Sequence, residues 1–172
     1  MDQFVGESFL TMDPGVHGKV LAYEKGNPHP VLVCSPRQPE DLSRLMRVTG
    51  ARVLVVEQQY VTSLQRARSV VELSFGSGLA IGWLCCTRAP VHATHLFEVA
   101  PASWQAHQRG HVGRAKKGEA NALMMAKAAE FVRQFPAEPF CLWWNAEVKA
   151  GKEGLAAALA MGEFWKHTAW PA

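Results

Sequence analysis

The run of residues 52–56, Arg-Val-Leu-Val-Val, is the feature of this sequence that most constrains its fold. A nearly continuous stretch of β-branched and aliphatic residues is typical of a parallel strand that is buried on both faces of a sheet. Glu57 follows the run directly, so the strand carries an acidic side chain out of a buried sheet. Ligands of open α/β sheets bind at the carboxyl ends of the strands. The run therefore predicts a sheet covered on both faces and a candidate site where this strand ends.

Shorter strands and helices surround this run in an order that defines the sheet. Three short strands joined by tight turns precede it and predict an antiparallel meander, and a second alternating strand–helix unit follows it. The predicted strands are residues 7–12, 19–25, 30–34, 52–56 and 91–99, and the predicted helices are residues 39–49, 62–86, 101–108, 119–135 and 151–167. We therefore expect an α/β fold with one five-stranded mixed sheet, three antiparallel strands followed by two parallel strands, flanked by helices.

Length and composition predict a single domain over residues 1–172, because about 150 residues is the usual size of one domain. The chain is 48% hydrophobic and 19% charged, which excludes a disordered chain. No apolar run approaches the ~20 residues of a membrane span, and the N-terminus lacks the pattern of a secretory signal. The four cysteines have no CxxC spacing, so we expect reduced thiols in a cytoplasmic protein. The net charge of +3 permits a polyanionic partner without requiring one.

Asp13 and Glu57 are the strongest candidates for chemistry, because each follows a predicted strand. If the two strands are neighbours, the carboxylates meet at one edge of the sheet, where they repel unless a cation neutralises them. Hard oxygen ligands favour Mg²⁺ or Mn²⁺, whereas an acid taken alone is more often a helix cap or a surface charge. Glu153 begins the last predicted helix, whose Ala-rich sequence would let it lie close on the sheet and bring this acid towards the other two. Glu147 is a weaker fourth candidate.

Four stretches of the sequence are distinctive in combination. Residues 12–15 read Met-Asp-Pro-Gly, and residues 55–60 read Val-Val-Glu-Gln-Gln-Tyr. Residues 98–104 read Glu-Val-Ala-Pro-Ala-Ser-Trp, ahead of a basic Gly-Arg-Ala-Lys-Lys-Gly, and residues 152–158 read Lys-Glu-Gly-Leu-Ala-Ala-Ala. In order and spacing they resemble the RuvC-type Holliday junction resolvases of the ribonuclease H-like superfamily, especially the compact, divergent members carried by bacteriophages. Two departures stand out: the last acid is Glu153 where the family usually has Asp, and Ala150 stands where relatives often have another acid or a His.

The resemblance implies a structure-selective endonuclease of DNA recombination and repair that cleaves four-way (Holliday) junctions by metal-dependent phosphodiester hydrolysis. It implies two ions, Mg²⁺ or Mn²⁺, with Asp13 bridging both and Glu57 and Glu153 holding one each. It also implies a homodimer acting on branched DNA in the cytoplasm of a bacterial or phage-infected cell. The alternatives are a ribonuclease H-like nuclease acting on RNA–DNA hybrids or RNA, a non-catalytic junction-binding protein, and a sugar-kinase or actin-like ATPase, a class that normally has two such domains.

Aromatic and basic residues predict the nucleic-acid contacts. By the same resemblance, Tyr60 would stack on an unpaired base at the branch point, although an edge aromatic that packs on the following helix is an equal alternative. Phe75 is a weaker candidate for an aromatic side chain that wedges between bases at the branch point. The densest basic segment is Gly-rich, which suits contact with phosphates without base reading, or else it is a solvated loop. Its candidate contacts are Arg109, Arg114, Lys116 and Lys117.

Glycines in the second predicted helix bear on the oligomeric state. Gly76, Gly78 and Gly82 each lower helix stability by ~1 kcal/mol relative to alanine. The presence of three glycines in spite of this loss of helix stability suggests the close approach of another backbone. We therefore predict a dimer interface across this helix. A helix that breaks near Gly76 is the alternative.

Overall fold

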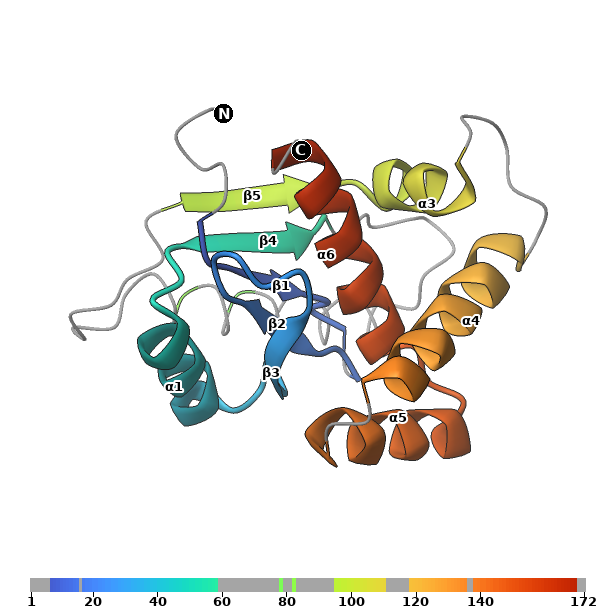
Figure 1. The fold of residues 1–172 in the computed structure, drawn as a ribbon, viewed down its shortest axis with the longest axis horizontal. Coiled ribbons are helices and arrows are strands. Elements are labelled where there is room, and N and C mark those ends of the chain that lie inside the picture. The colour runs from blue at the N-terminus through green and yellow to red at the C-terminus, as the bar shows by residue number, and fades with distance from the viewer. Residues whose placement is uncertain are drawn as a thin grey trace.

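The computed structural model describes residues 7–15, 17–58, 78, 82, 95–110, 118–135 and 138–169 (Figure 1). The residues predicted to contact nucleic acid, apart from Arg109, lie outside these ranges, namely Tyr60, Phe75, Arg114, Lys116 and Lys117. Of the predicted helix at residues 62–86, only Gly78 and Gly82 are described, and both are helical. No heavy atom of the described residues lies within 4 Å of a Cβ built on either glycine, so no described contact requires glycine there.

A five-stranded mixed sheet lies at the centre of the fold, in the strand order β3-β2-β1-β4-β5. The strands are β1 (Phe9–Met12), β2 (Val20–Tyr23), β3 (Pro30–Cys34), β4 (Val53–Glu57) and β5 (His95–Val99). The first three form an antiparallel meander. β4 pairs in parallel with β1, and β5 pairs in parallel with β4. This is the predicted sheet, with the predicted buried run as the interior strand β4, between β1 and β5.

Five helices with defined bounds surround the sheet: α1 (Pro39–Thr49), α3 (Pro101–Arg109), α4 (Glu119–Gln134), α5 (Glu138–Ala150) and α6 (Gly154–Ala169). Local sequence explains the ends of α1, which begins with a proline and two acidic residues in its first turn and ends at Gly50 in the left-handed conformation, φ 64°. Gly151, φ 62°, likewise follows the end of α5, so the last helix begins at Gly154 and not at residue 151 as predicted.

Helix α5 was not predicted from the sequence. Its inward side carries Phe140, Trp143, Trp144 and Glu147, a helical spacing in which an acid occupies one of the positions that face the protein. An acidic residue on an apolar stripe weakens the pattern, because charged side chains are almost never fully buried unless they are paired. Glu147 is 4% exposed, and its pairing is described below.

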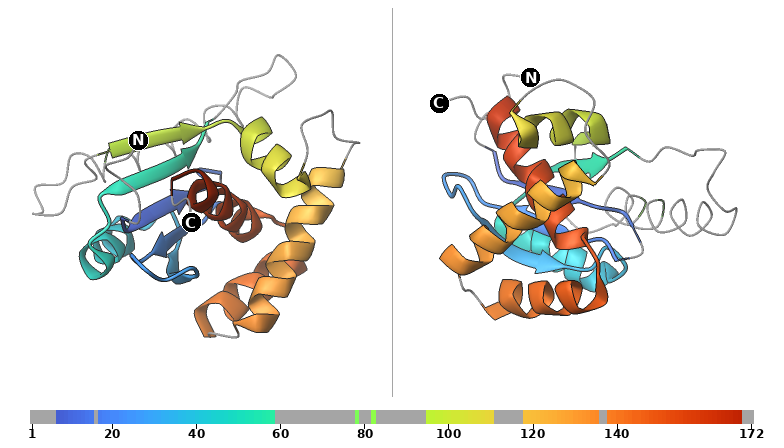
Figure 2. Two further views of the ribbon diagram at one scale, coloured as in Figure 1. Left: turned by 45° about the horizontal axis from the view of Figure 1, so that its top comes forward. Right: turned by 90° about the vertical axis from the view of Figure 1, so that its right-hand side faces the viewer.

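The alternation of side chains along the strands divides the core into two layers. Leu10, Met12 and Val56 point to the face that packs on α1. Phe9 and Val55 point to the opposite face, which packs on α6 and, beyond it, α3, α4 and α5. Figure 2 shows the sheet between α1 on one side and α6, α4 and α5 on the other. Among the described residues, no helix has the length and hydropathy of a membrane span.

Helix α6 lies directly on the sheet, as its Ala-rich sequence predicts. A Cβ on Gly162 would stand 2.1 Å from the Tyr23 hydroxyl oxygen, so only glycine permits this approach to β2. The Thr11 hydroxyl on β1 donates a hydrogen bond to the Ala158 carbonyl at 3.0 Å. This close packing determines where the N-terminus of α6 lies, and with it Glu153.

Candidate functional site

Asp13 and Glu57 lie at the carboxyl ends of two adjacent strands, β1 and β4. Met12 of β1 is paired with Val56 of β4 in parallel register, so the next residue on each strand is Asp13 and Glu57. By alternation both side chains belong to the face that α6 covers. The two strands are therefore neighbours, which is the condition under which their carboxylates lie at one edge of the sheet. The Glu57 carboxylate accepts a hydrogen bond from Trp104 Nε1 of α3 at 3.2 Å, which ties this acid to the helix that follows β5.

Asp13 lies in a tight loop between β1 and β2. Its Oδ1 accepts a hydrogen bond from the Gly15 amide at 2.9 Å, and its own amide donates to the Lys19 carbonyl at 3.0 Å. A Cβ on Gly18 would stand 1.8 Å from the Asp13 carbonyl oxygen, so the return of the chain into β2 requires glycine. The sequence therefore builds a compact loop that fixes Asp13 at the end of β1.

The surroundings of Asp13 disfavour its negative charge. Burial is the largest effect and raises the pKa of this carboxyl, and the nearby Glu147 and Glu153 carboxylates raise it further. The Gly15 amide and the Lys19 ammonium act in the opposite direction but do not cancel the rise. A cation bound at this position would relieve the same electrostatic penalty.

An open cleft of about 290 Å³ connects Asp13 with Glu153. It lies where the β1–β2 loop meets the turn between α5 and α6, and its lining is Asp13, Gly15, His17, Gly18, Gly151, Lys152, Glu153 and Gly154. A Cβ on Gly154 would stand 2.2 Å from the His17 carbonyl oxygen, so the start of α6 is in direct contact with the loop. Loss of solvation and the nearby Lys152 lower the pKa of His17, which favours the neutral form of this imidazole.

Glu153 is an exposed side chain at the entrance of the last helix. Asn121 of α4 donates from Nδ2 to both of its carboxylate oxygens, at 3.1 Å to Oε1 and 2.8 Å to Oε2. Sequence reasoning did not single out Asn121. The two residues are 32 positions apart, and no local pattern links an asparagine in the first turn of one helix to the residue before another.

Glu147 has a different role from the other acids. Both of its oxygens accept a hydrogen bond from the Leu155 amide in the first turn of α6, at 3.0 and 2.8 Å. Its Oε1 is also 3.0 Å from the Lys19 ammonium, which in turn donates to the His17 and Gly18 carbonyls. Glu147 therefore caps α6 as half of a buried ion pair, and it does not line the cleft. To serve as a metal ligand it would have to give up these contacts.

The structure thus brings Asp13 and Glu153 to one cleft and places Glu57 at the neighbouring strand end. Within the described residues, no group of three or more His, Cys, Asp or Glu side chains is close enough to hold one metal ion as it stands. Two carboxylates, one of them with its charge disfavoured, nevertheless provide the hard oxygen ligands that Mg²⁺ and Mn²⁺ prefer. Asp13 and Glu153 are therefore the residues of the cleft that could hold a divalent ion, with Glu57 at the end of the neighbouring strand.

Arg109 is the one residue predicted to contact nucleic acid that the structure describes. It is the last residue of α3, half-buried, and is followed by Gly110 in the left-handed conformation, φ 72°. The chain therefore turns sharply out of α3 immediately before the basic segment.

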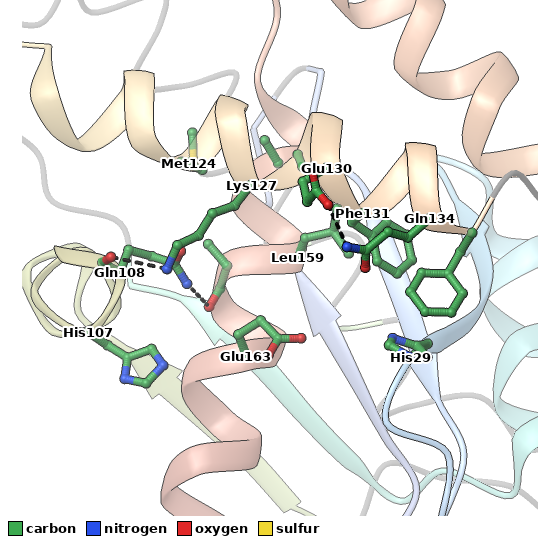
Figure 3. A pocket seen from close by; sticks show the side chains of 14 residues that line it. His29, His107, Gln108, Met124, Lys127, Glu130, Phe131, Gln134, Leu159 and Glu163 are labelled. Carbon is green, nitrogen blue, oxygen red and sulfur yellow. Dashed lines mark hydrogen bonds between the residues drawn. The ribbon is translucent and has the colours of Figure 1, made fainter. Parts of the chain in front are cut away.

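A second cavity, of about 280 Å³, lies between α3, α4 and α6 (Figure 3). Its wall includes apolar side chains such as Met124 and Leu159, and it shares no lining residue with the acidic cleft. Two of its charged groups have partners: the Lys127 ammonium donates to the Gln108 carbonyl at 3.1 Å, and Glu163 pairs with a lysine on its own helix. The cavity holds none of the predicted site residues.

The strand order, the parallel central pair and the acid at the end of β1 define an α/β protein with a ribonuclease H-like fold. Comparison with solved structures specifies that fold further as RuvC-like. The chain is similar to Thermus thermophilus RuvC in complex with a Holliday junction substrate, with 14% identity, a TM-score of 0.51 and coverage of 92% of each chain. A second structure of Thermus thermophilus RuvC matches with 14% identity and a TM-score of 0.49, over 94% of this chain and 96% of that one. No protein-family model and no curated protein sequence matches this chain.

Proposed function

We propose that this protein is a metal-dependent endonuclease that cleaves branched DNA, with the four-way junction as its preferred substrate. The observation that carries the proposal is the convergence of Asp13 and Glu153 on an open cleft at the carboxyl end of the central strands. The RuvC-like fold supports the choice of reaction, since the similar Thermus protein was solved with a Holliday junction substrate.

The proposed site would combine three carboxylate ligands with a lysine and a histidine that lie beside them. Asp13 would be shared between two Mg²⁺ or Mn²⁺ ions, with Glu153 on one ion and Glu57 on the other. Such ions activate water at neutral pH and stabilise charge on the attacking and leaving oxygens. Lys152 and the neutral His17 line the same cleft, where the lysine ammonium would attract a backbone phosphate and the imidazole nitrogen would accept a proton from a nearby water.

The wider contacts with DNA belong to the proposal as well. Arg109 and the basic residues 114, 116 and 117 would contact phosphates, and Tyr60 would stack on a base at the branch point, with Phe75 as a weaker wedge. A homodimer would place two such sites on opposed strands of a junction. We propose that the protein acts in this form in the cytoplasm.

One observation favours a second candidate, a junction-binding protein without nuclease activity. As described, the acids do not form a group of three around one point, and Glu57 is hydrogen-bonded to Trp104. If these contacts persist when DNA binds, the fold would recognise a junction without hydrolysing it.

The deciding experiment compares labelled four-way junction, flap, linear duplex and RNA–DNA hybrid in Mg²⁺, in Mn²⁺ and in EDTA. We expect metal-dependent cleavage of the junction by the wild type. Asp13→Asn should bind the junction but not cleave it, because it removes ligand charge and leaves the basic contacts. Binding without cleavage by the wild type would favour the second candidate. Preferred cleavage of the hybrid would instead indicate another ribonuclease H-like nuclease, and wild-type rates in Asp13→Asn would refute the site.

A further inference from the structure

We propose that Asn121 is a positioning residue for Glu153, and that it keeps this carboxylate oriented for a divalent cation. The proposal rests on the metal site put forward above and extends it to a helix that supplies none of the predicted ligands. Asn121 lies in the first turn of α4, and its Nδ2 is 2.8 Å from Glu153 Oε2 and 3.1 Å from Oε1.

The backbone of Glu153 is fixed, whereas its side chain is not. The Glu153 carbonyl accepts the Ala157 amide at 2.8 Å, and the Lys152 amide donates to the Glu147 carbonyl at 2.9 Å. Glycine at position 154 then lets the turn contact the β1–β2 loop. The side chain itself is exposed, and among the described residues its carboxylate accepts its hydrogen bonds from Asn121. Without them, the carboxylate would be free to rotate away from the cleft.

The group that donates to Glu153 is a neutral amide, and this matters for cation binding. Two carboxylates flank the N-terminus of α6, and they have different partners. Glu147 is buried against the Lys19 ammonium, so its charge is balanced. Glu153 is held by a neutral amide, which orients a carboxylate without cancelling its charge. A lysine in the same place would compete with a cation, whereas an asparagine leaves the full negative charge available. Hydrogen-bonding partners of this kind orient metal-ligating side chains, and their loss typically lowers metal affinity by about 10- to 100-fold.

Helix α4 can hold Asn121 accurately because its other side is anchored in the core. Ala120, Met124, Ala128 and Val132 are buried along one face of the helix. Asn121 is adjacent to the first of these and is itself exposed. A rigid, packed helix positions a functional side chain better than a loop does.

The test is a Mn²⁺ titration of the whole protein without DNA, followed by electron paramagnetic resonance of free Mn²⁺. The variants are Asn121→Leu, which keeps the branched shape of the side chain and removes the donor, Glu153→Gln, and the double variant. Asn145→Leu is the matched control, because Asn145 is an exposed helical asparagine on α5. We expect Asn121→Leu to weaken Mn²⁺ binding about tenfold, and Asn145→Leu to leave it unchanged. In the Glu153→Gln background, Asn121→Leu should have no further effect, because the two residues act through one contact.

A purely structural tether between α4 and α6 gives a different result. It would lower the unfolding temperature of Asn121→Leu in EDTA while leaving the Mn²⁺ dissociation constant of the folded protein unchanged, and that result would overturn the proposal. Equal losses in Asn121→Leu and Asn145→Leu would also overturn it. If the wild type does not bind Mn²⁺, or if Glu153→Gln binds it normally, the proposed metal site itself is wrong. If Glu153→Gln is impaired and Asn121→Leu is not, only the role of Asn121 is refuted.

Discussion

Replacing Lys19 with methionine tests the buried ion pair beneath the acidic cleft. Lys19 is 5% exposed and Glu147 is 4% exposed, with 3.0 Å between Nζ and Oε1. The same ammonium donates to the His17 carbonyl at 2.8 Å and lies 4.6 Å from the centroid of the Trp143 ring. Methionine fills a similar volume without a charge, so Lys19→Met leaves the Glu147 carboxylate buried without its counter-ion.

The expected loss of stability follows from these contacts. Removing one partner of a buried ion pair lowers the free energy of unfolding by about 3–5 kcal/mol, because the remaining charge stays desolvated. The lost contact with the Trp143 ring adds to this loss. The Leu155 amide still donates to Glu147 in the variant, and this remaining hydrogen bond reduces the loss of stability. We therefore expect a loss of about 4 kcal/mol, which lowers the unfolding temperature by about 8–16 °C for a chain of this size.

Urea-induced unfolding in EDTA, followed by circular dichroism, measures this loss. The matched control is Lys25→Met, because Lys25 and Glu7 form an ion pair at 3.6 Å in which the two side chains are 67% and 53% exposed. Such surface pairs contribute less than about 1 kcal/mol. The double variant with Lys19→Met and Glu147→Gln should regain more than half of the loss, since neither charge then remains. A loss below about 1 kcal/mol in Lys19→Met, or an equal loss in Lys25→Met, would refute the reasoning.

Two further measurements test the electrostatics of Asp13 and the proposed DNA contacts. Because burial raises the pKa of Asp13 above its ordinary value of 3.8, the folded protein loses stability as the pH rises from that value through the raised pKa. Asp13→Asn should therefore be the more stable protein at pH 7 in EDTA, with a difference that disappears in acid, and equal unfolding curves at pH 7 would contradict this. Replacing Lys116 and Lys117 with alanine should flatten the slope of log junction affinity against log salt by up to about two units. An unchanged slope, measured in Ca²⁺, would place the DNA path elsewhere.

Local patterns predicted much of the fold because the interactions behind them are local. The β-branched run before Glu57 predicted a buried parallel strand, and the structure has β4 inside the sheet, between β1 and β5 and parallel to both. The proline and glycine that delimit α1 act through their own backbone angles, φ 64° at Gly50, which any fold would have to satisfy. The Ala-rich stretch after Glu153 predicted a helix in close contact with the sheet, since small side chains set the distance of approach.

The sequence by itself thus determined the sheet, the acids that follow its central strands and the closely packed last helix. Tertiary structure alone decided how the acids are used. Glu153 and, more weakly, Glu147 are candidate ligands by position in the chain, but Lys19 pairs with Glu147 and Asn121 holds Glu153. Both partners come from segments distant in sequence, and pairing at that distance depends on how the β1–β2 loop packs against α5 and how α4 packs against the start of α6. Helix α5 was missed for the same physical reason, because a buried acid on its inward face is stable only when the lysine that pairs with it is in place.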